Sequence, residues 1–242
     1  MKLLLIRHGD PDYEHDTLTE RGWKEAELLS RRMVLEPADH YYMSCLGRAK
    51  DTASCTMQKL GRAAIELPWL QEFQGRAYKP DIPGEPSLAW DWMPKDWTVD
   101  ARFYDRNTWT EPKGMTELNA KERYDWVCKN FDALLEEHGY QRNGNYYNVI
   151  RPNEETLVFF CHFAVGCVLI SHLLNVSPMI LWHGLCAAPT SVTKIVTEER
   201  EKGIASFRML YYGDTSHLTE NGMEPAFSAR FCECYDNTEQ RH

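Results

Sequence analysis

The chain has 242 residues, of which 43% are hydrophobic and 26% charged, as in an ordinary soluble globular protein. Its formal net charge of −9 leaves no excess of lysine and arginine to neutralise a nucleic-acid backbone, so we expect no nucleic-acid partner. The eight cysteines include no C-x-x-C pair, which argues against a zinc or dithiol motif. The first apolar run is too short for a secretory signal, and no segment could span a bilayer. We therefore expect no membrane partner and a cytoplasmic location.

The first apolar run, residues 3–6, predicts a strand that is buried on both faces. Arg7, His8 and Gly9 follow where that strand ends, and open α/β sheets keep their chemistry at such strand ends. A neutral imidazole is a nucleophile toward phosphorus, and a guanidinium group offers a planar set of donors that matches phosphate oxygens. The alternative is that His8 only satisfies a hydrogen bond at the end of the strand.

The next elements alternate between helix and strand. An acidic loop over 10–16 precedes a helix with Thr19 as its N-cap, and a short strand at 40–43 delivers residues 44–48 to its end. A second helix follows, with Arg48 in its first turn. Because a cation there opposes the helix dipole, Arg48 needs either an acidic partner or a bound anion, and we favour the anion.

A third predicted strand, 63–67, leads into a loop that places Glu72 among apolar residues. Burial raises the proton affinity of a carboxyl group, as a general acid for an alkoxide leaving group requires. The alternative is a solvated loop glutamate. Asp12 and Glu14, which lie close to His8 in the sequence, are rival acids.

The stretch 76–148 contains many prolines and five of the eight tryptophans. We expect it to be an insertion that lies over the sheet edge as a cap, within a single domain spanning 1–242. Its last part predicts a helix from about Thr116 to His138, with Gly139 as the C-cap. The aromatic side chains form either the core of the cap or a contact with an apolar part of a ligand.

A second buried strand is predicted over 156–160, and an apolar helix begins directly after His162 at its end. His162 therefore repeats the placement of His8, beside a helix N-terminus that attracts anions. Further along, residues 189–197 and 204–212 predict an antiparallel hairpin at the edge of the sheet.

Four site motifs follow one another along the chain: Arg7-His8-Gly9, residues 44–48, Glu72 and His162. In this order and in these structural contexts, the chain resembles the histidine phosphatase superfamily, which has the phosphoglycerate-mutase-like fold. The resemblance covers residues 1–75 and 155–218. It implies a three-layer α/β/α sandwich with a mostly parallel central sheet.

The resemblance also implies a role for each matching residue. His8 would be phosphorylated transiently, while Arg7, Arg48 and His162 hold the phosphoryl oxygens. Glu72 would protonate the leaving group and then activate water. Fixed cationic donors suit this reaction, because charge spreads over the phosphoryl oxygens in the transition state. Family enzymes of this type need no metal and no other cofactor.

Two features separate the chain from the phosphoglycerate mutases of this fold. Those enzymes usually carry an Asn in a longer loop after the nucleophile motif and another Asn shortly after the second histidine. Here the loop reads Asp10-Pro11-Asp12-Tyr13, and His162 is followed by Phe163. The sequence therefore favours a phosphomonoester hydrolase acting on a small phosphorylated molecule. The alternatives are a phosphomutase and a phosphate-binding module without turnover.

Overall fold

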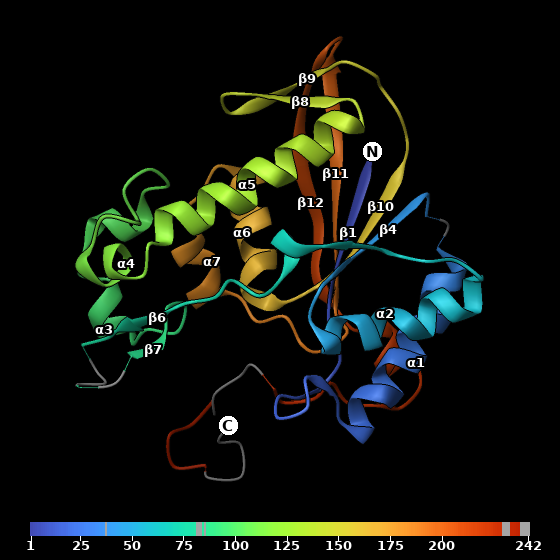
Figure 1. Cartoon of the computed structure of the whole chain (residues 1–242), viewed down its shortest axis with the longest axis horizontal. Helices are drawn as coiled ribbons and strands as arrows, with labels where there is room; N and C mark the ends of the chain where they lie inside the picture. Colours follow the sequence, from blue (N-terminus) through green and yellow to red (C-terminus); the bar gives the residue numbers. More distant parts are fainter. Residues whose placement is uncertain (37, 81–83, 85, 229–232, 238–242) are drawn as a thin grey trace.

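A central sheet of eight strands organises the protein (Figure 1). The computed structural model describes residues 1–36, 38–80, 84, 86–228 and 233–237. In spatial order the strands are β5 (Ile65–Leu67), β4 (His40–Ser44), β10 (Thr156–Cys161), β1 (Lys2–Arg7), β11 (Val192–Glu201), β12 (Ile204–Asp214), β9 (Tyr146–Val149) and β8 (Tyr140–Asn143). The first four run parallel, and the pairings from β1 to β8 are antiparallel. Six of the eight strands thus point the same way, which confirms the predicted mostly parallel sheet.

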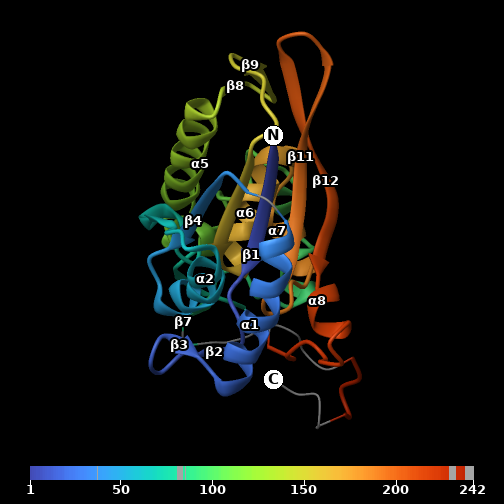
Figure 2. The same cartoon turned by 90° about the vertical axis from the view of Figure 1, so that its right-hand side faces the viewer.

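Helices cover both faces of the sheet, which confirms the predicted three layers (Figures 1 and 2). One face carries α1 (Glu20–Leu35), α2 (Gly47–Leu60) and the short α8 (Ser216–Thr219). The other carries α5 (Ala120–Glu137), α6 (Phe163–Leu174) and α7 (Pro178–Gly184). Successive side chains of β1 point to opposite faces: Leu4 and Ile6 join the core under α1 and α2, and Leu3 and Leu5 join the other core. This explains the uninterrupted apolar run of β1.

The region 76–148 contributes to two parts of the molecule. Its second half supplies α5 and the β8–β9 hairpin, which belong to the main layers. Its first half forms small elements beside α5 and α7 (Figure 1). These are β6 (Arg76–Tyr78), β7 (Pro86–Leu88), α3 (Pro94–Trp97), a 3-10 turn (Ala101–Tyr104) and α4 (Lys113–Glu117). A further 3-10 turn, Pro68–Leu70, precedes this region. The predicted helix is α5, and Gly139 follows it with a φ of 93°.

The predicted hairpin β11–β12 is present, but its predicted place at the sheet edge is wrong. β11 pairs with β1, β12 pairs with β9, and β8 forms the edge. The strands β8 and β9 were not predicted, because each is only four residues long and mostly polar. No helix in the described part of the chain is long and apolar enough to cross a membrane.

Two glycines allow the chain after β1 to approach α1 closely, next to the two-stranded pair β2 (Pro11–Asp12) and β3 (Thr17–Leu18). A Cβ atom on Gly22 would lie 2.2 Å from the carbonyl oxygen of Asp10, and one on Gly9 would lie 2.8 Å from the carbonyl oxygen of Gly22. The predicted N-cap Thr19 accepts a hydrogen bond from the Gly22 amide at 3.0 Å. The turn after β1 is thus held against the first turn of α1.

We expect Gly22→Ala to destabilise the protein by about 2 to 4 kcal/mol, because backbone must move to admit the methyl group. Gly61→Ala is the matched control. Gly61 has a φ of 62° but no atom within 4 Å of an added Cβ, so we expect only the conformational cost of about 1 kcal/mol. Urea unfolding of the two variants measures the difference. Equal midpoints would contradict the tight contact.

Candidate active site

The carboxyl ends of β1 and β10 bring two histidines together. The strands are parallel neighbours with Arg7 opposite Cys161, so the residues that follow them leave the sheet side by side. The ring centroids of His8 and His162 lie 5.1 Å apart, and each residue is only 2% exposed. The geometric expectation that these distant histidines converge is met.

His8 is held as a neutral imidazole with one free nitrogen. Its Nδ1 lies 2.7 Å from the carbonyl oxygen of Gly9, which can only accept, so Nδ1 carries the proton and Nε2 keeps its lone pair. Burial, together with the positive charges of Arg7 and Arg48, holds the pKa of His8 well below its ordinary value. Nε2 is therefore available as a nucleophile over a wide pH range.

His162 lies beside His8 with one ring nitrogen unpartnered. The Ser44 hydroxyl accepts a hydrogen bond from the Leu46 amide at 3.2 Å and lies 2.8 Å from His162 Nε2. A hydroxyl can donate one hydrogen bond and accept two, so Ser44 can pair with either neutral tautomer of His162. Nδ1 of His162 is buried and has no partner. Burial and the neighbouring His8 hold the pKa of His162 well below its ordinary value, so both histidines of the pair are neutral.

Both predicted arginines lie at this edge with one donor unused. Arg7, 7% exposed, donates from Nη1 to the carbonyl oxygens of Ala187 at 2.7 Å and Ser228 at 3.2 Å. Arg48 donates from Nη1 to Asp16 Oδ1 at 2.6 Å. The Nε atoms of Arg7 and Arg48 are both buried without a partner. Each guanidinium is therefore fixed at one end and open at the other.

Asp16 supplies the acidic partner that a purely structural role of Arg48 requires. Its other oxygen, Oδ2, accepts from the Gly47 amide at 2.7 Å, at the N-terminus of α2. A Cβ on Gly47 would lie 2.0 Å from the carbonyl oxygen of Asp16, so glycine permits this contact. Sequence reasoning missed Asp16, which was only one of several acidic residues in the 10–16 loop. The ion pair orients Arg48, while Arg48 Nε remains available for an anion.

The half-buried Glu72 lies against the start of α6. Its Oε1 accepts from the amides of Phe73 at 2.9 Å and Val165 at 3.0 Å. The α6 N-terminus therefore meets the carboxylate of Glu72, whereas the sequence indicated an anion-binding role for it. Burial raises the pKa of Glu72, and these amides offset that only in part.

The rival acids occupy a different environment. Asp12 accepts a hydrogen bond from His15 at 2.8 Å, which keeps the pKa of Asp12 below its ordinary value. Glu14 is exposed on the same loop. Because a general acid must hold its proton near neutral pH, this geometry favours Glu72 over both.

Several polar groups hold the backbone around His8. The Thr52 hydroxyl accepts from the Gly9 amide at 2.9 Å, and the Thr190 amide donates to the His8 carbonyl at 3.1 Å. His217 lies behind Thr190, with Nε2 3.1 Å from the Thr190 hydroxyl. Sequence reasoning assigned no role to these residues, because only the folded chain brings them to the backbone of His8.

Three buried nitrogens without partners belong to residues at this edge of the sheet. In the described part of the chain, eight buried side-chain nitrogen or oxygen atoms have no hydrogen-bond partner. Three of them are Arg7 Nε, Arg48 Nε and His162 Nδ1; the two arginine atoms are donors, and His162 Nδ1 is a donor in one of its two neutral tautomers. Buried donors without partners are uncommon and costly. Donors without acceptors, beside two arginines, are the arrangement expected around a bound anion.

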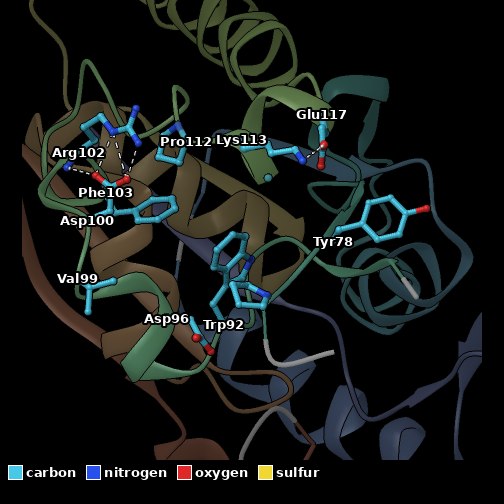
Figure 3. A pocket seen from close by; sticks show the side chains of 12 residues that line it. Tyr78, Trp92, Asp96, Val99, Asp100, Arg102, Phe103, Pro112, Lys113 and Glu117 are labelled. Atoms are coloured by element: carbon cyan, nitrogen blue, oxygen red, sulfur yellow. Dashed lines mark hydrogen bonds and ion pairs between the residues drawn. The ribbon is translucent and has the colours of Figure 1, made fainter. Parts of the chain in front are cut away.

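The aromatic region 76–119 forms a separate pocket of about 440 Å³ (Figure 3). Trp92 and Phe103 face it, and none of the predicted site residues lines it. Trp90 makes the connection to the site, because its ring packs edge-on against Phe163 with centroids 5.8 Å apart. Other aromatic residues of the region, including Trp109, are buried in the main core.

The fold is an α/β sandwich, and it brings two histidines and two arginines to one edge of its central sheet. A family model, histidine phosphatase superfamily (branch 1), matches residues 3–209. The chain therefore belongs to the histidine phosphatase superfamily, and the resemblance seen in the sequence is confirmed. No curated protein sequence matches the chain.

Several solved structures of similar fold are named as phosphatases. A phosphoserine phosphatase from Entamoeba histolytica, solved as a variant with phosphoserine, is 17% identical, with a TM-score of 0.56 over 90% of this chain and 98% of its own. A mycobacterial glucosyl-3-phosphoglycerate phosphatase is 18% identical, with a TM-score of 0.55 over 88% and 98%. The alpha-ribazole phosphatase from Shigella flexneri is 18% identical, with a TM-score of 0.55 over 89% and 97%. At this identity the likeness establishes the shared fold.

Proposed function

We propose that the protein hydrolyses phosphomonoesters of small molecules through a phosphohistidine on His8. The observation that carries the proposal is the buried pair His8 and His162, with the free Nε2 of His8, beside two arginines whose Nε atoms are buried without a partner. Guanidinium N–H groups donate to the non-bridging oxygens of a phosphoryl group, and they stabilise its charge most in the transition state.

The reaction has two steps. In the first, His8 Nε2 forms a bond to phosphorus as the ester P–O bond breaks, and Glu72 gives its proton to the leaving oxygen. In the second, Glu72 takes a proton from water, the water oxygen bonds to phosphorus, and the P–N bond to His8 breaks. The raised pKa of Glu72 suits both steps, because the group must hold a proton and then accept one.

The substrate is proposed only as a class. The relatives of the same fold include enzymes whose names refer to phosphoserine and glucosyl-3-phosphoglycerate, which are small phosphate esters. The cap role of 76–148 remains a prediction, and the contact of Trp90 with Phe163 connects this region to the residue that follows His162. An apolar part of a substrate would meet this contact.

Turnover of p-nitrophenyl phosphate over a pH series tests hydrolysis directly. A second assay supplies 3-phosphoglycerate and follows both free phosphate and 2-phosphoglycerate. Hydrolysis predicts free phosphate, whereas phosphate movement between hydroxyls without release would identify a mutase. Binding of inorganic phosphate without turnover of any ester would identify a binding module and contradict the proposal.

We expect Arg48→Lys to lower kcat/KM by about 100-fold, the scale on which one preorganised donor acts. Lysine keeps the charge and can still pair with Asp16, but it lacks the planar fork and the free Nε. Arg62→Lys is the matched control at the other end of α2, where Arg62 donates to the carbonyl oxygens of Ala38 and Asp39. Steady-state kinetics measures kcat/KM of both variants. An equal loss of kcat/KM in both would argue against an anion site at Arg48.

A further inference from the structure

A cluster of side chains that can bind a metal ion lies at the opposite end of the sheet from His8. His40 begins β4, Glu155 directly precedes β10, and His138 follows the last turn of α5. One potential ligand atom from each lies within 4.8 Å of the other two. We propose that these three residues bind a divalent transition-metal ion of the zinc type. Sequence spacing could not reveal this site, because its members lie 98 and 17 residues apart.

The three side chains converge on one carboxylate oxygen. Glu155 Oε2 lies 2.6 Å from His138 Nδ1 and 3.9 Å from His40 Nε2. The two imidazole rings lie 4.7 Å apart between centroids. Two imidazole nitrogens and one carboxylate oxygen are a donor set that zinc takes with three protein ligands and water. A small movement suffices for binding, because the ion replaces the proton shared by His138 and Glu155.

His138 and Glu155 are each held by a second group. The hydroxyl of Tyr42 lies 2.8 Å from His138 Nε2, so it can accept the ring proton once Nδ1 binds an ion. Arg151 Nη1 donates to Glu155 Oε1 at 2.9 Å, which leaves Oε2 facing the histidines. A metal-binding histidine normally donates its other N–H to an oxygen in this way. Tyr42 and Arg151 thus supply the hydrogen bonds that orient His138 and Glu155 as metal ligands.

The site is open to solvent on one side and distant from the phosphate-binding residues. The side chain of His40 is 41% exposed, which gives an ion an entry path. His40 and Ser44 lie four positions apart along the extended strand β4, which is a span of about 13 Å. A bound ion would connect β4, the end of α5 and the start of β10. We therefore infer a stabilising cross-link that takes no part in phosphate chemistry.

Calorimetric titration of the metal-stripped, reduced full chain with Zn²⁺ tests the proposal. We expect His40→Ala and Glu155→Gln each to weaken one site by at least about 10-fold. His15→Ala is the matched control, because His15 pairs with Asp12 at 2.8 Å but belongs to no group of three metal-ligand side chains among the described residues. Unchanged isotherms in the first two variants would overturn the site. Thermal unfolding without metal confirms that each variant folds.

Two further measurements distinguish metal binding at this site from metal binding by cysteine thiols. Co²⁺ bound by nitrogen and oxygen gives visible bands without the intense near-ultraviolet absorption of a thiolate complex. A spectrum of thiolate type only, unaffected by His40→Ala, would overturn the proposal. Saturating Zn²⁺, at about 100 times its Kd, should raise the Tm of the wild type by roughly 5 to 10 °C and that of His40→Ala much less. Tyr42→Phe should weaken binding by about 10 to 100-fold through His138.

Discussion

The variant His8→Ala is expected to lose phosphatase activity by about 10⁴-fold or more, because alanine offers no atom that can form a bond to phosphorus. Rapid quenching of the wild type with a labelled ester should trap one phosphate per chain that is stable to alkali and released by acid. The variant should trap none. Both measurements use p-nitrophenyl phosphate, so that the result does not depend on knowing the natural substrate.

His40→Ala is the matched control for the nucleophile, because it removes an imidazole at the other end of the sheet. We expect it to turn over substrate and to trap phosphate like the wild type. Inorganic phosphate should still protect His8→Ala against thermal unfolding, because Arg7, Arg48 and His162 remain. Phosphate trapped on His8→Ala at the wild-type level would rule out His8 as the nucleophile.

The variant Glu72→Gln is expected to lose about 10³-fold in kcat toward an alkyl phosphate, the scale of general acid catalysis. Glutamine keeps the acceptor oxygen that meets the Phe73 and Val165 amides, but it cannot donate a proton to the leaving oxygen. With p-nitrophenyl phosphate the outcome differs, since p-nitrophenolate leaves without protonation. The first turnover should stay fast, while attack of water slows and phosphohistidine accumulates as a burst.

The pH profile supplies an independent readout of the same group. A general acid works in its protonated form, so kcat for an alkyl ester should fall as pH rises through the raised pKa of Glu72. On the acid side, the lowered pKa of His8 should keep it neutral, and activity should persist below the ordinary range of histidine. Glu72→Gln should lose the alkaline limb.

The rival acids serve as controls for Glu72. Asp12→Asn and Glu14→Gln each remove one of the two rival carboxylates; Asp12 ends β2, and Glu14 follows it in the sequence. We expect neither to show the burst nor to lose the alkaline limb. If Asp12→Asn reproduced both effects while Glu72→Gln did not, the assignment of the acid would pass to Asp12.

Local sequence signals were sufficient for the elements that carry the site. The apolar runs of β1 and β10 are long enough to indicate burial on both faces, and each is followed at once by a histidine. Since parallel neighbours end at one edge, His8 and His162 had to approach each other. The β8–β9 hairpin lacked such a signal, because strands of four mostly polar residues resemble loops.

Contacts between distant segments explain what the sequence could not reveal. Asp16 is one acidic residue among several in its loop, and only the approach of that loop to α2 makes it the partner of Arg48. Likewise, nothing in the sequence indicates that Ser44 contacts His162 Nε2. Contacts of this kind, between a site residue and a side chain from a distant segment, depend on tertiary packing. Hydrophobic periodicity indicates only which faces of a helix or strand are buried.

The hydrogen bond from His8 Nδ1 to the Gly9 carbonyl has a consequence for the lifetime of a phosphorylated enzyme. Once phosphorus is attached to Nε2, the ring keeps its Nδ1 proton and becomes cationic. A carboxylate in this position would compensate that charge and could remove the proton, which would leave a sluggish neutral adduct. An amide oxygen orients the ring and does neither. The imidazolium therefore remains a good leaving group, and water can release the phosphate quickly.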